Sequence, residues 1–345
     1  MNESLIIAKG GKPVRPENRP PPRWQRLLKD AIRDPLELCR LLKLPDQYHA
    51  AAVRAARGFP LFVPRGYVDL MRRGDPADPL LRQVLPLAEE LADVPGFSAD
   101  PVGDGPVTLV PGLLHKYAGR ALLVLTGACA VHCRYCFRRE FPYHESPRSP
   151  DEWQRAIERI AADETIDEVI LSGGDPLMLR DEPLGQLADR MASIGHVRRL
   201  RIHSRLPIVL PERVCDDLLA WLRGTRLTPI VVVHANHPAE LSPAAAAALG
   251  RLADAGVPLL NQSVLLAGVN DNADILTELC RRLVDLRVMP YYLHQLDRVR
   301  GAAHFEAPEA TGRRLIAELR RRLPGYAVPH YVRETPGERH KTVLA

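Results

Sequence analysis

The run Thr126-Gly-Ala-Cys129-Ala-Val-His-Cys133-Arg-Tyr-Cys136-Phe-Arg-Arg139 places three cysteines within eight residues, directly after an apolar stretch typical of a buried strand. Three is the informative number, because a structural zinc site and an ordinary 4Fe–4S cluster each use four protein ligands. A cluster held by three thiolates keeps one iron free to bind a small molecule. The spacing therefore predicts a reactive iron centre at a strand end. The alternative is a zinc site completed by His132 or a distant cysteine.

Composition and length set the class of protein. The 345 residues are 46% hydrophobic and 26% charged, which is typical of a globular chain with one large domain and an appended region. Neither a secretory signal nor an apolar stretch of about 18 residues is apparent, so we expect a cytoplasmic protein without a membrane span. A net charge of +5 and only 5% aromatic residues argue against nucleic-acid binding.

Apolar, β-branched runs alternate with helical patterns from residue 120 onward. We expect strands at 121–126, 168–172, 199–203, 229–234, 258–265 and 288–293, with helices near 150–162, 182–193, 211–223, 241–255, 272–286 and 307–323. Six such units predict an α/β fold, a partial (β/α)6 barrel with its chemistry at the carboxyl ends of the strands. An open doubly wound sheet is the competing architecture.

The rest of the chain is expected to flank this barrel. Residues 1–24 are predicted to be a proline-rich arm, and 25–115 a helical N-terminal cap with helical patterns near 24–43, 46–57 and 80–92 and a turn-rich connection at 94–116. Asp34-Pro35 and Asp46 stand where helix N-terminal caps are expected. The core is then 116–330, followed by a C-terminal segment at 331–345. No part of the first third is expected to join the sheet.

Polar residues follow the expected strands. Ser172-Gly173-Gly174-Asp175 ends the second strand, Asn261-Gln262 belongs to the fifth, and Asp297 follows the sixth. Glycines at such a point can expose backbone groups to a ligand, although a Gly-Gly turn needs no ligand by itself. A packed core alone does not explain why polar residues recur at the carboxyl ends of successive strands.

Several longer motifs carry a family resemblance. They are the cysteine run, Ser172-Gly-Gly-Asp-Pro-Leu177, Phe59-Pro-Leu-Phe-Val-Pro-Arg-Gly-Tyr67, Asn261-Gln-Ser-Val-Leu-Leu-Ala-Gly-Val-Asn-Asp271 and Tyr291-Tyr-Leu-His-Gln-Leu-Asp297. Over roughly residues 25–345 the chain strongly resembles the lysine 2,3-aminomutases, which are radical S-adenosylmethionine enzymes. It is most similar to a shorter bacterial branch that serves the β-lysylation of elongation factor P, because it stops four residues after Lys341.

The resemblance implies three cofactors. A 4Fe–4S cluster would be bound by Cys129, Cys133 and Cys136, S-adenosylmethionine would bind its open iron, and pyridoxal 5′-phosphate would be attached to Lys341. The further cofactor contacts implied are Tyr117, Arg120, Ser172, Gly173, Gly174, Asp175, Asn261 and Gln262.

The resemblance also implies the substrate contacts. Arg138 matches the residue that pairs with the substrate carboxylate, and Asp297 matches the one that holds the ε-ammonium group. Glu334 stands where lysine aminomutases have a second aspartate, so the charge is kept on a side chain one methylene longer. That difference leaves the substrate pose and the product's handedness open.

The implied activity is the conversion of free L-lysine to β-lysine. The implied partners are an electron donor such as flavodoxin or ferredoxin and, functionally, the ligase that modifies elongation factor P; an oligomer is left open. The rival hypotheses are an aminomutase for glutamate or arginine, and a zinc-stabilised binding module without redox activity.

Overall fold

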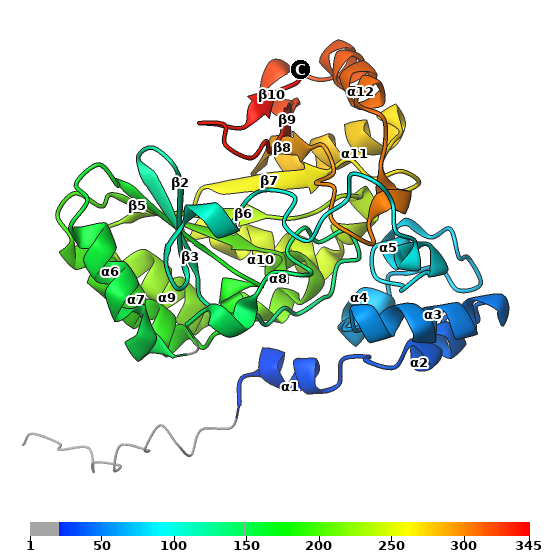
Figure 1. Ribbon diagram of the computed structural model, residues 1–345, viewed down its shortest axis with the longest axis horizontal. Helices are drawn as coiled ribbons and strands as arrows, with labels where there is room; N and C mark the ends of the chain where they lie inside the picture. Colours follow the sequence, from blue (N-terminus) through cyan, green and yellow to red (C-terminus); the bar gives the residue numbers. More distant parts are fainter. Residues whose placement is uncertain (1–20, 148) are drawn as a thin grey trace, which may run out of the picture.

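One ten-stranded sheet forms the centre of the protein in the computed structural model, which describes residues 21–147 and 149–345 (Figure 1). The arm predicted for 1–24 lies outside the described residues except at 21–24. The strands are β1 (Thr108–Val110), β2 (Leu113–Tyr117), β3 (Arg120–Val124), β4 (Glu168–Ser172), β5 (Arg199–Ser204), β6 (Thr228–Val233), β7 (Leu259–Val264), β8 (Val288–His294), β9 (His330–Arg333) and β10 (Thr342–Val343).

The strands lie in the sheet in chain order. Strands β3 to β9 run parallel to one another, whereas β1, β2 and β3 at one edge and β9 and β10 at the other form antiparallel pairs. A doubly wound sheet reverses its strand order near the middle, and this sheet does not. The partial (β/α)6 barrel predicted from the sequence is therefore confirmed, with all six predicted strands present.

Helices follow the parallel strands as expected. They are α6 (Gln154–Ala161), α7 (Asp181–Ser193), α8 (Leu206–Val209), α9 (Asp216–Gly224), α10 (Pro243–Asp254), α11 (Ala273–Asp285) and α12 (Glu309–Arg322). Side-chain caps fix several starts: Ser242 accepts from the backbone of α10, and Asn272 from that of α11. Over 21–147 and 149–345, no helix is both long and apolar enough to cross a membrane.

The N-terminal region is mostly helical, with α1 (Arg23–Lys29), α2 (Pro35–Leu41), α3 (Gln47–Gly58), α4 (Arg65–Val68) and α5 (Pro79–Arg82). The helical pattern predicted at 24–43 forms two helices, α1 and α2, and the cap predicted at Asp34-Pro35 is confirmed, because Asp34 caps the helix that begins at Pro35. The helix predicted at 80–92 is wrong: only α5 and the 3₁₀ turn η2 (Ala88–Leu91) form, on either side of Pro86.

The turn-rich connection predicted at 94–116 is the largest departure. It contains β1 and most of β2, a hairpin that extends the sheet beyond the first barrel strand. Gly112 makes the hairpin turn with a φ of 79°, and a Cβ there would lie 2.4 Å from Pro147. The expectation that no part of the first third joins the sheet is therefore wrong for residues 108–117.

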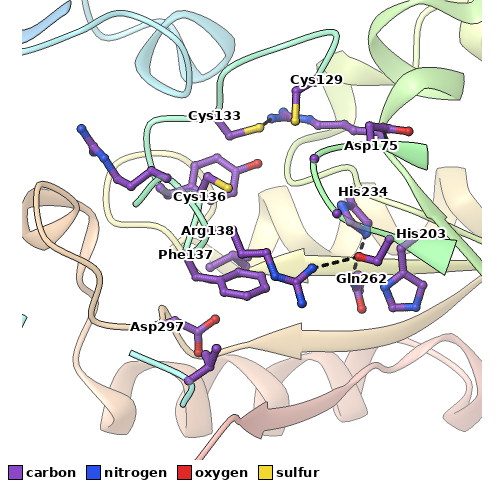
Figure 2. Close-up of a pocket in the computed structure, with 18 of the residues that line it drawn as sticks. Cys129, Cys133, Cys136, Phe137, Arg138, Asp175, His203, His234, Gln262 and Asp297 are labelled. Atoms are coloured by element: carbon purple, nitrogen blue, oxygen red, sulfur yellow. Dashed lines mark hydrogen bonds between the residues drawn. The ribbon is translucent and has the colours of Figure 1, made fainter. Parts of the chain in front are cut away.

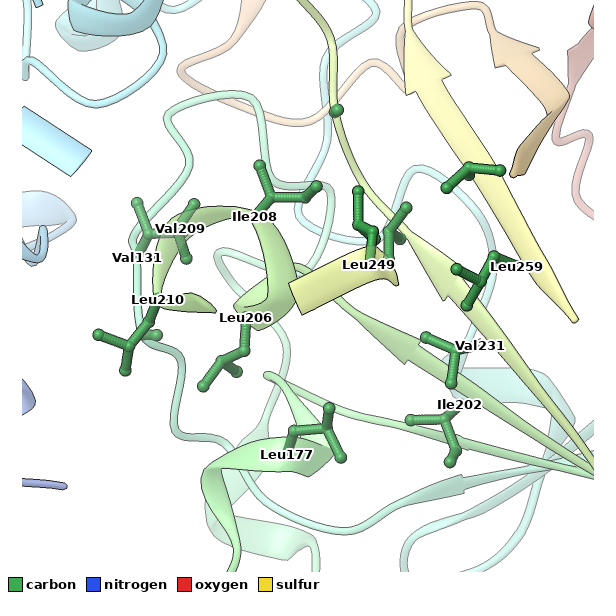
Figure 3. Close-up of a cluster of buried hydrophobic side chains, with 14 of the residues drawn as sticks. Val131, Leu177, Ile202, Leu206, Ile208, Val209, Leu210, Val231, Leu249 and Leu259 are labelled. Carbon is green, nitrogen blue, oxygen red and sulfur yellow. The ribbon is translucent and has the colours of Figure 1, made fainter. Parts of the chain in front are cut away.

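An apolar layer between the sheet and its helices supports the strand ends (Figure 3). Ile202, Val231 and Leu259 come from three neighbouring strands, and Leu249 of α10 packs on the same cluster. Val131, from the cysteine run, is 4% exposed in this layer, so one side of the cysteine loop is anchored in the core. Burying one such side chain contributes about 1.5–3 kcal/mol.

Candidate active site

A cavity of about 560 Å³ lies at the carboxyl ends of the barrel strands. All three cysteines of the run line it, and so do Lys341 and Asp297, which are far away in sequence (Figure 2). The residues of the predicted site found in its lining are Cys129, Cys133, Cys136, Tyr117, Arg120, Arg138, Ser172, Gly173, Gly174, Asp175, Gln262, Asp297, Glu334 and Lys341. The fold thus brings together almost every residue selected from the sequence.

Asn261 is the exception, because it does not line the cavity. Its amide accepts a hydrogen bond from Ala235 N at 2.9 Å and donates to Ser263 Oγ at 2.9 Å. Side chains alternate along a strand, so Gln262 faces the cavity while Asn261 points to the opposite side of the sheet. Asn261 links β7 to the end of β6 by hydrogen bonds, and its side chain does not face the cavity in which a cofactor contact was predicted.

The cysteine loop and the Gly-Gly turn form one backbone unit. Gly174 N donates to Thr126 O at 2.7 Å, and Asp175 N donates to Ala128 O at 2.8 Å. A Cβ on Gly173 would lie 2.5 Å from Thr126 O, and one on Gly174 would lie 2.4 Å from Ala128 O. Gly173 also has a φ of +123°, which side chains rarely adopt. The glycines are therefore needed for close contact with the cysteine loop itself.

The N-terminal region holds the other side of the cysteine loop. Arg134, which is fully buried, makes a two-pronged ion pair with Glu90 at 2.8 and 2.6 Å and donates to Phe59 O at 2.8 Å. His132 N donates to Phe62 O, and the His132 ring stacks on Phe59 with centroids 5.1 Å apart. Phe59 and its neighbours therefore support the cysteine run through direct contacts with Arg134 and His132.

The donor set fits a cluster better than a single metal ion. Burial raises the pKa of Cys129 well above its ordinary value and that of Cys136 to about 11, so a bound cation would be needed to hold both as thiolates. In the described part of the chain, no three His, Cys, Asp or Glu side chains are grouped as ligands of one metal ion. His132, the candidate fourth zinc ligand, has its Nδ1 2.8 Å from Pro60 O.

Arg205 at the end of β5 was not selected from the sequence, yet it contacts the cysteine loop. One guanidinium nitrogen donates to Cys133 Sγ at 2.6 Å, and another donates to Glu240 at 2.9 Å and Gln83 at 2.7 Å. Asp175 accepts from Arg205 N at 2.8 Å, and burial raises the pKa of Asp175 to about 6. The signal in the sequence was the run His203-Ser-Arg205 at a strand end.

Arg138 is buried beside Phe137, whose ring centroid lies 4.9 Å from its guanidinium carbon (Figure 2). Its Nε donates to Asp104 at 2.9 Å and its Nη1 to Ser172 Oγ at 3.0 Å. Its Nη2 has no hydrogen-bond partner in 21–147 and 149–345. Asp104 was not selected from the sequence, because the loop before β1 carries no motif.

Glu334, just after β9, is the centre of an ionic group. It pairs with Lys341, accepts from Tyr117, and accepts from Lys116 at 3.1 Å. Burial acts to raise its pKa, but Lys341 together with the Tyr117 and Lys116 contacts lowers the pKa of Glu334 to about 2. The β9–β10 hairpin brings Lys341 to this point, and Arg120 lies over the Tyr117 ring at 4.7 Å.

Asp297 faces the same cavity without a hydrogen-bonded partner for its carboxylate among the described residues (Figure 2). Burial raises the pKa of Asp297 to about 7, against the opposing effect of Lys341. An unpartnered carboxylate in a half-buried position is costly, and a cationic ligand would relieve that cost.

Three histidines complete the lining. Gln262 Nε2 lies 2.8 Å from His234 Nε2, and burial lowers the pKa of His234 to about 3. The Nε2 atoms of His203 and His294 are buried and have no hydrogen-bond partner among the described residues, although both rings line the cavity. Such atoms are normally hydrogen-bonded, so they fit a site for an organic ligand with polar groups.

Comparison with known proteins gives consistent matches. Residues 123–223 match the Radical SAM superfamily. L-lysine 2,3-aminomutase of Escherichia coli is 48% identical over 322 residues, covering 93% of this chain and 94% of that protein. The Haemophilus influenzae protein of that name is 44% identical, covering 96% and 98%. The Clostridium subterminale enzyme is 37% identical, covering 93% of this chain and 76% of that protein.

Proposed function

Because this chain belongs to the L-lysine 2,3-aminomutase family of radical S-adenosylmethionine enzymes, we propose that it converts L-lysine to β-lysine with pyridoxal 5′-phosphate as its further cofactor. Membership makes the protein an isomerase. The family implies a 4Fe–4S cluster and S-adenosylmethionine, and the three cysteines of the run are the residues that would bind the cluster. These two groups, when bound, supply the electron and the hydrogen-abstracting radical.

The observation that carries the substrate proposal is the placement of an open guanidinium donor and an open carboxylate around one cavity. Within the part of the chain that the structure describes, Arg138 keeps its Nη2 free for a carboxylate, and Asp297 keeps its carboxylate free for a cation. A free amino acid with a cationic side chain meets both needs. Glutamate would bring a second carboxylate towards Asp297 and Glu334, so the geometry disfavours it, whereas arginine keeps the cation and is the closer rival.

Lys341 is the residue proposed to hold pyridoxal 5′-phosphate, which when bound would carry the migrating amino nitrogen. The lysine lines the cavity and is paired with Glu334. Because Glu334 is ionised at neutral pH, it holds the Lys341 ammonium at the cavity wall. Tyr117 and Lys116 also donate to Glu334, so its charge stays compensated when Lys341 leaves. Arg120 and Tyr117, which line the same cavity, are the residues proposed to receive the phosphate.

The deciding experiment is product analysis with anaerobically reconstituted enzyme, S-adenosylmethionine and a reductant such as reduced flavodoxin or ferredoxin. L-Lysine, L-arginine and L-glutamate are supplied separately, and β-amino acids are identified by chromatography and mass spectrometry. We expect β-lysine alone. Formation of another β-amino acid without β-lysine would refute the lysine assignment. A Lys341→Ala variant that still formed a borohydride-reducible adduct with pyridoxal 5′-phosphate would refute the cofactor assignment.

We further propose that the β-lysine is consumed by the ligase that modifies elongation factor P in the cytoplasm. The mutual coverage above 90% with the Escherichia coli protein, against 76% of the longer Clostridium enzyme, supports placement in the shorter branch. Co-expression of elongation factor P, its ligase and this chain should add the mass of one lysine residue to elongation factor P. Lys341→Ala should abolish that addition, and an unchanged mass with the unaltered chain would refute the pathway.

A further inference from the structure

The loop at 100–108, between the N-terminal helices and β1, is built around the carboxylate of Asp104. The Asp100 side chain accepts from Asp104 N at 2.9 Å and from Gly105 N at 3.0 Å. Thr108 Oγ1 donates to Asp104 O at 3.0 Å. Asp104 is therefore held on both sides of its Cα, and its position does not depend on a single contact.

The Asp104 carboxylate is directed at the site described above. It is 5% exposed, accepts from Arg138 Nε at 2.9 Å and lies 3.6 Å from Lys116 Nζ. A buried carboxylate without compensation is costly, and here the two cations compensate it.

The contacts of Arg138 divide its donors between protein and cavity. Nε is used by Asp104 and Nη1 by Ser172 Oγ, whereas Nη2 has no partner among the residues that the structure describes. Two fixed contacts on a planar group set the direction of the third nitrogen. A carboxylate that enters the cavity then finds donors already oriented.

We propose that Asp104 is a positioning residue that orients Arg138 for the carboxylate of the substrate. The inference rests on the proposed function, because it takes Arg138 as the carboxylate-binding group. It assigns to the loop before β1, which carries no motif, an indirect part in substrate recognition. Asp104 acts through Arg138 and does not itself touch the reacting atoms.

The alternative for the same geometry is that Asp104 competes with the substrate for Arg138. A competitor would have to leave when the substrate binds. Asp104 instead accepts only from Nε and leaves the neighbouring Nη2 without a partner among the described residues, and the Asp100 and Thr108 contacts fix its backbone. The two roles predict opposite effects on affinity, so one measurement separates them.

The test compares L-lysine with cadaverine, which has both amino groups of lysine but no carboxylate. Equilibrium dialysis on the reconstituted holoenzyme gives the dissociation constant of each. In Asp104→Ala we expect lysine to bind about 10–100-fold more weakly, the range caused by misplacing a binding group by up to about 1 Å. Cadaverine should change by less than about threefold, because its contacts do not involve Arg138.

Two further variants separate geometry from charge. Asp104→Asn keeps an oxygen acceptor for Arg138 Nε and should stay within about fivefold of the unaltered protein, whereas Asp104→Glu should bind lysine poorly because its longer side chain displaces the guanidinium. Asp93→Ala, at an exposed aspartate, is the control for loss of one negative charge. Iron content and circular dichroism check that each variant is folded and loaded.

The outcomes are distinct. Lysine affinity unchanged or increased in Asp104→Ala, or equal losses for lysine and cadaverine, would overturn the proposal. So would a fully active Asp104→Glu beside a defective Asp104→Asn, which indicates a need for charge alone. If Asp104→Ala does not fold, the Asn and Glu variants decide. If the unaltered holoenzyme neither binds nor converts lysine, the proposed function has failed, and these variants are not the reason.

Discussion

Asp297→Asn should make the cofactor-free protein more stable while impairing its use of lysine. The pKa of this carboxyl rises from 3.8 to about 7 in the folded protein, because burial disfavours the charge. The folded state therefore binds a proton that the unfolded state has released over that pH range, and stability falls as pH rises through it. Above pH 7 the carboxylate is ionised at an energetic cost to the fold.

The magnitude follows from the difference between the two pKa values. At about 1.4 kcal/mol per pKa unit, the rise corresponds to roughly 4 kcal/mol at a pH above about 7 and to about half of that near pH 5.5. Residual hydration of a half-buried side chain reduces the effect, so we expect a gain of about 2–4 kcal/mol for the neutral asparagine at pH 8. The gain should shrink on acidification and vanish below about pH 4.

Urea unfolding of the full chain, without cofactors and under anaerobic conditions, measures this gain at pH 8 and pH 5.5. Asp93→Asn, at an exposed position, should change the free energy of unfolding by less than about 0.5 kcal/mol at either pH. The catalytic counterpart is a rise in KM for lysine of about 30-fold or more, because an ammonium loses its paired charge. A destabilised Asp297→Asn, or a gain independent of pH, would refute the reasoning.

Three other perturbations test the frame around this group. Gly174→Ala puts a Cβ 2.4 Å from the backbone of the cysteine loop, so the iron and sulfide content after reconstitution should fall at least about threefold. Gly195→Ala is the control, because its Cβ meets nothing within 4 Å, and it should retain the full content. Equal iron and sulfide contents in the two variants would contradict the predicted clash. Glu334→Gln removes a carboxylate whose pKa is lowered from 4.5 to about 2 in the folded protein. The free energy of unfolding should therefore fall by about 2–3 kcal/mol at neutral pH, and this loss should shrink as pH falls below about 4.5 in urea titrations. A loss of stability that stays constant with pH would contradict this prediction. Arg205→Gln leaves buried Glu240 without its cation and should cost about 3–5 kcal/mol in the same assay, with a cost below about 1 kcal/mol as the contrary result.

The repeating part of the fold was predictable because its signal is local. Each barrel strand is a short apolar run bounded by a helix, and the cysteine spacing marks which strand ends carry chemistry. The β1–β2 hairpin was missed because its strands are only three and five residues long and flank the turn signal Pro111-Gly112, which by itself indicates a loop. The helix start at Pro35 was predictable, because Asp34-Pro35 is a local cap signal.

The sequence predicted which residues line the candidate site more fully than it predicted the contacts between those residues. Resemblance selected Arg138 and Glu334, but nothing in the sequence pairs Arg138 with Asp104, which precedes it by 34 residues. The same holds for Arg205 and Cys133, whose contact joins two different strand ends. Asn261 was misplaced because the alternation of a strand decides which of two adjacent polar residues faces the cavity.

The shared backbone of the cysteine loop and the Gly-Gly turn has a thermodynamic consequence. Gly174 N and Asp175 N donate hydrogen bonds to the carbonyls of Thr126 and Ala128. Ordering the cysteine loop therefore restricts the Gly-Gly turn, and ordering the turn restricts the loop. A ligand that rigidifies one therefore lowers the entropic cost of a second ligand on its neighbour, and this coupling must be reciprocal. Cluster assembly and S-adenosylmethionine binding should each strengthen the other, so that partly loaded enzyme is the least populated form.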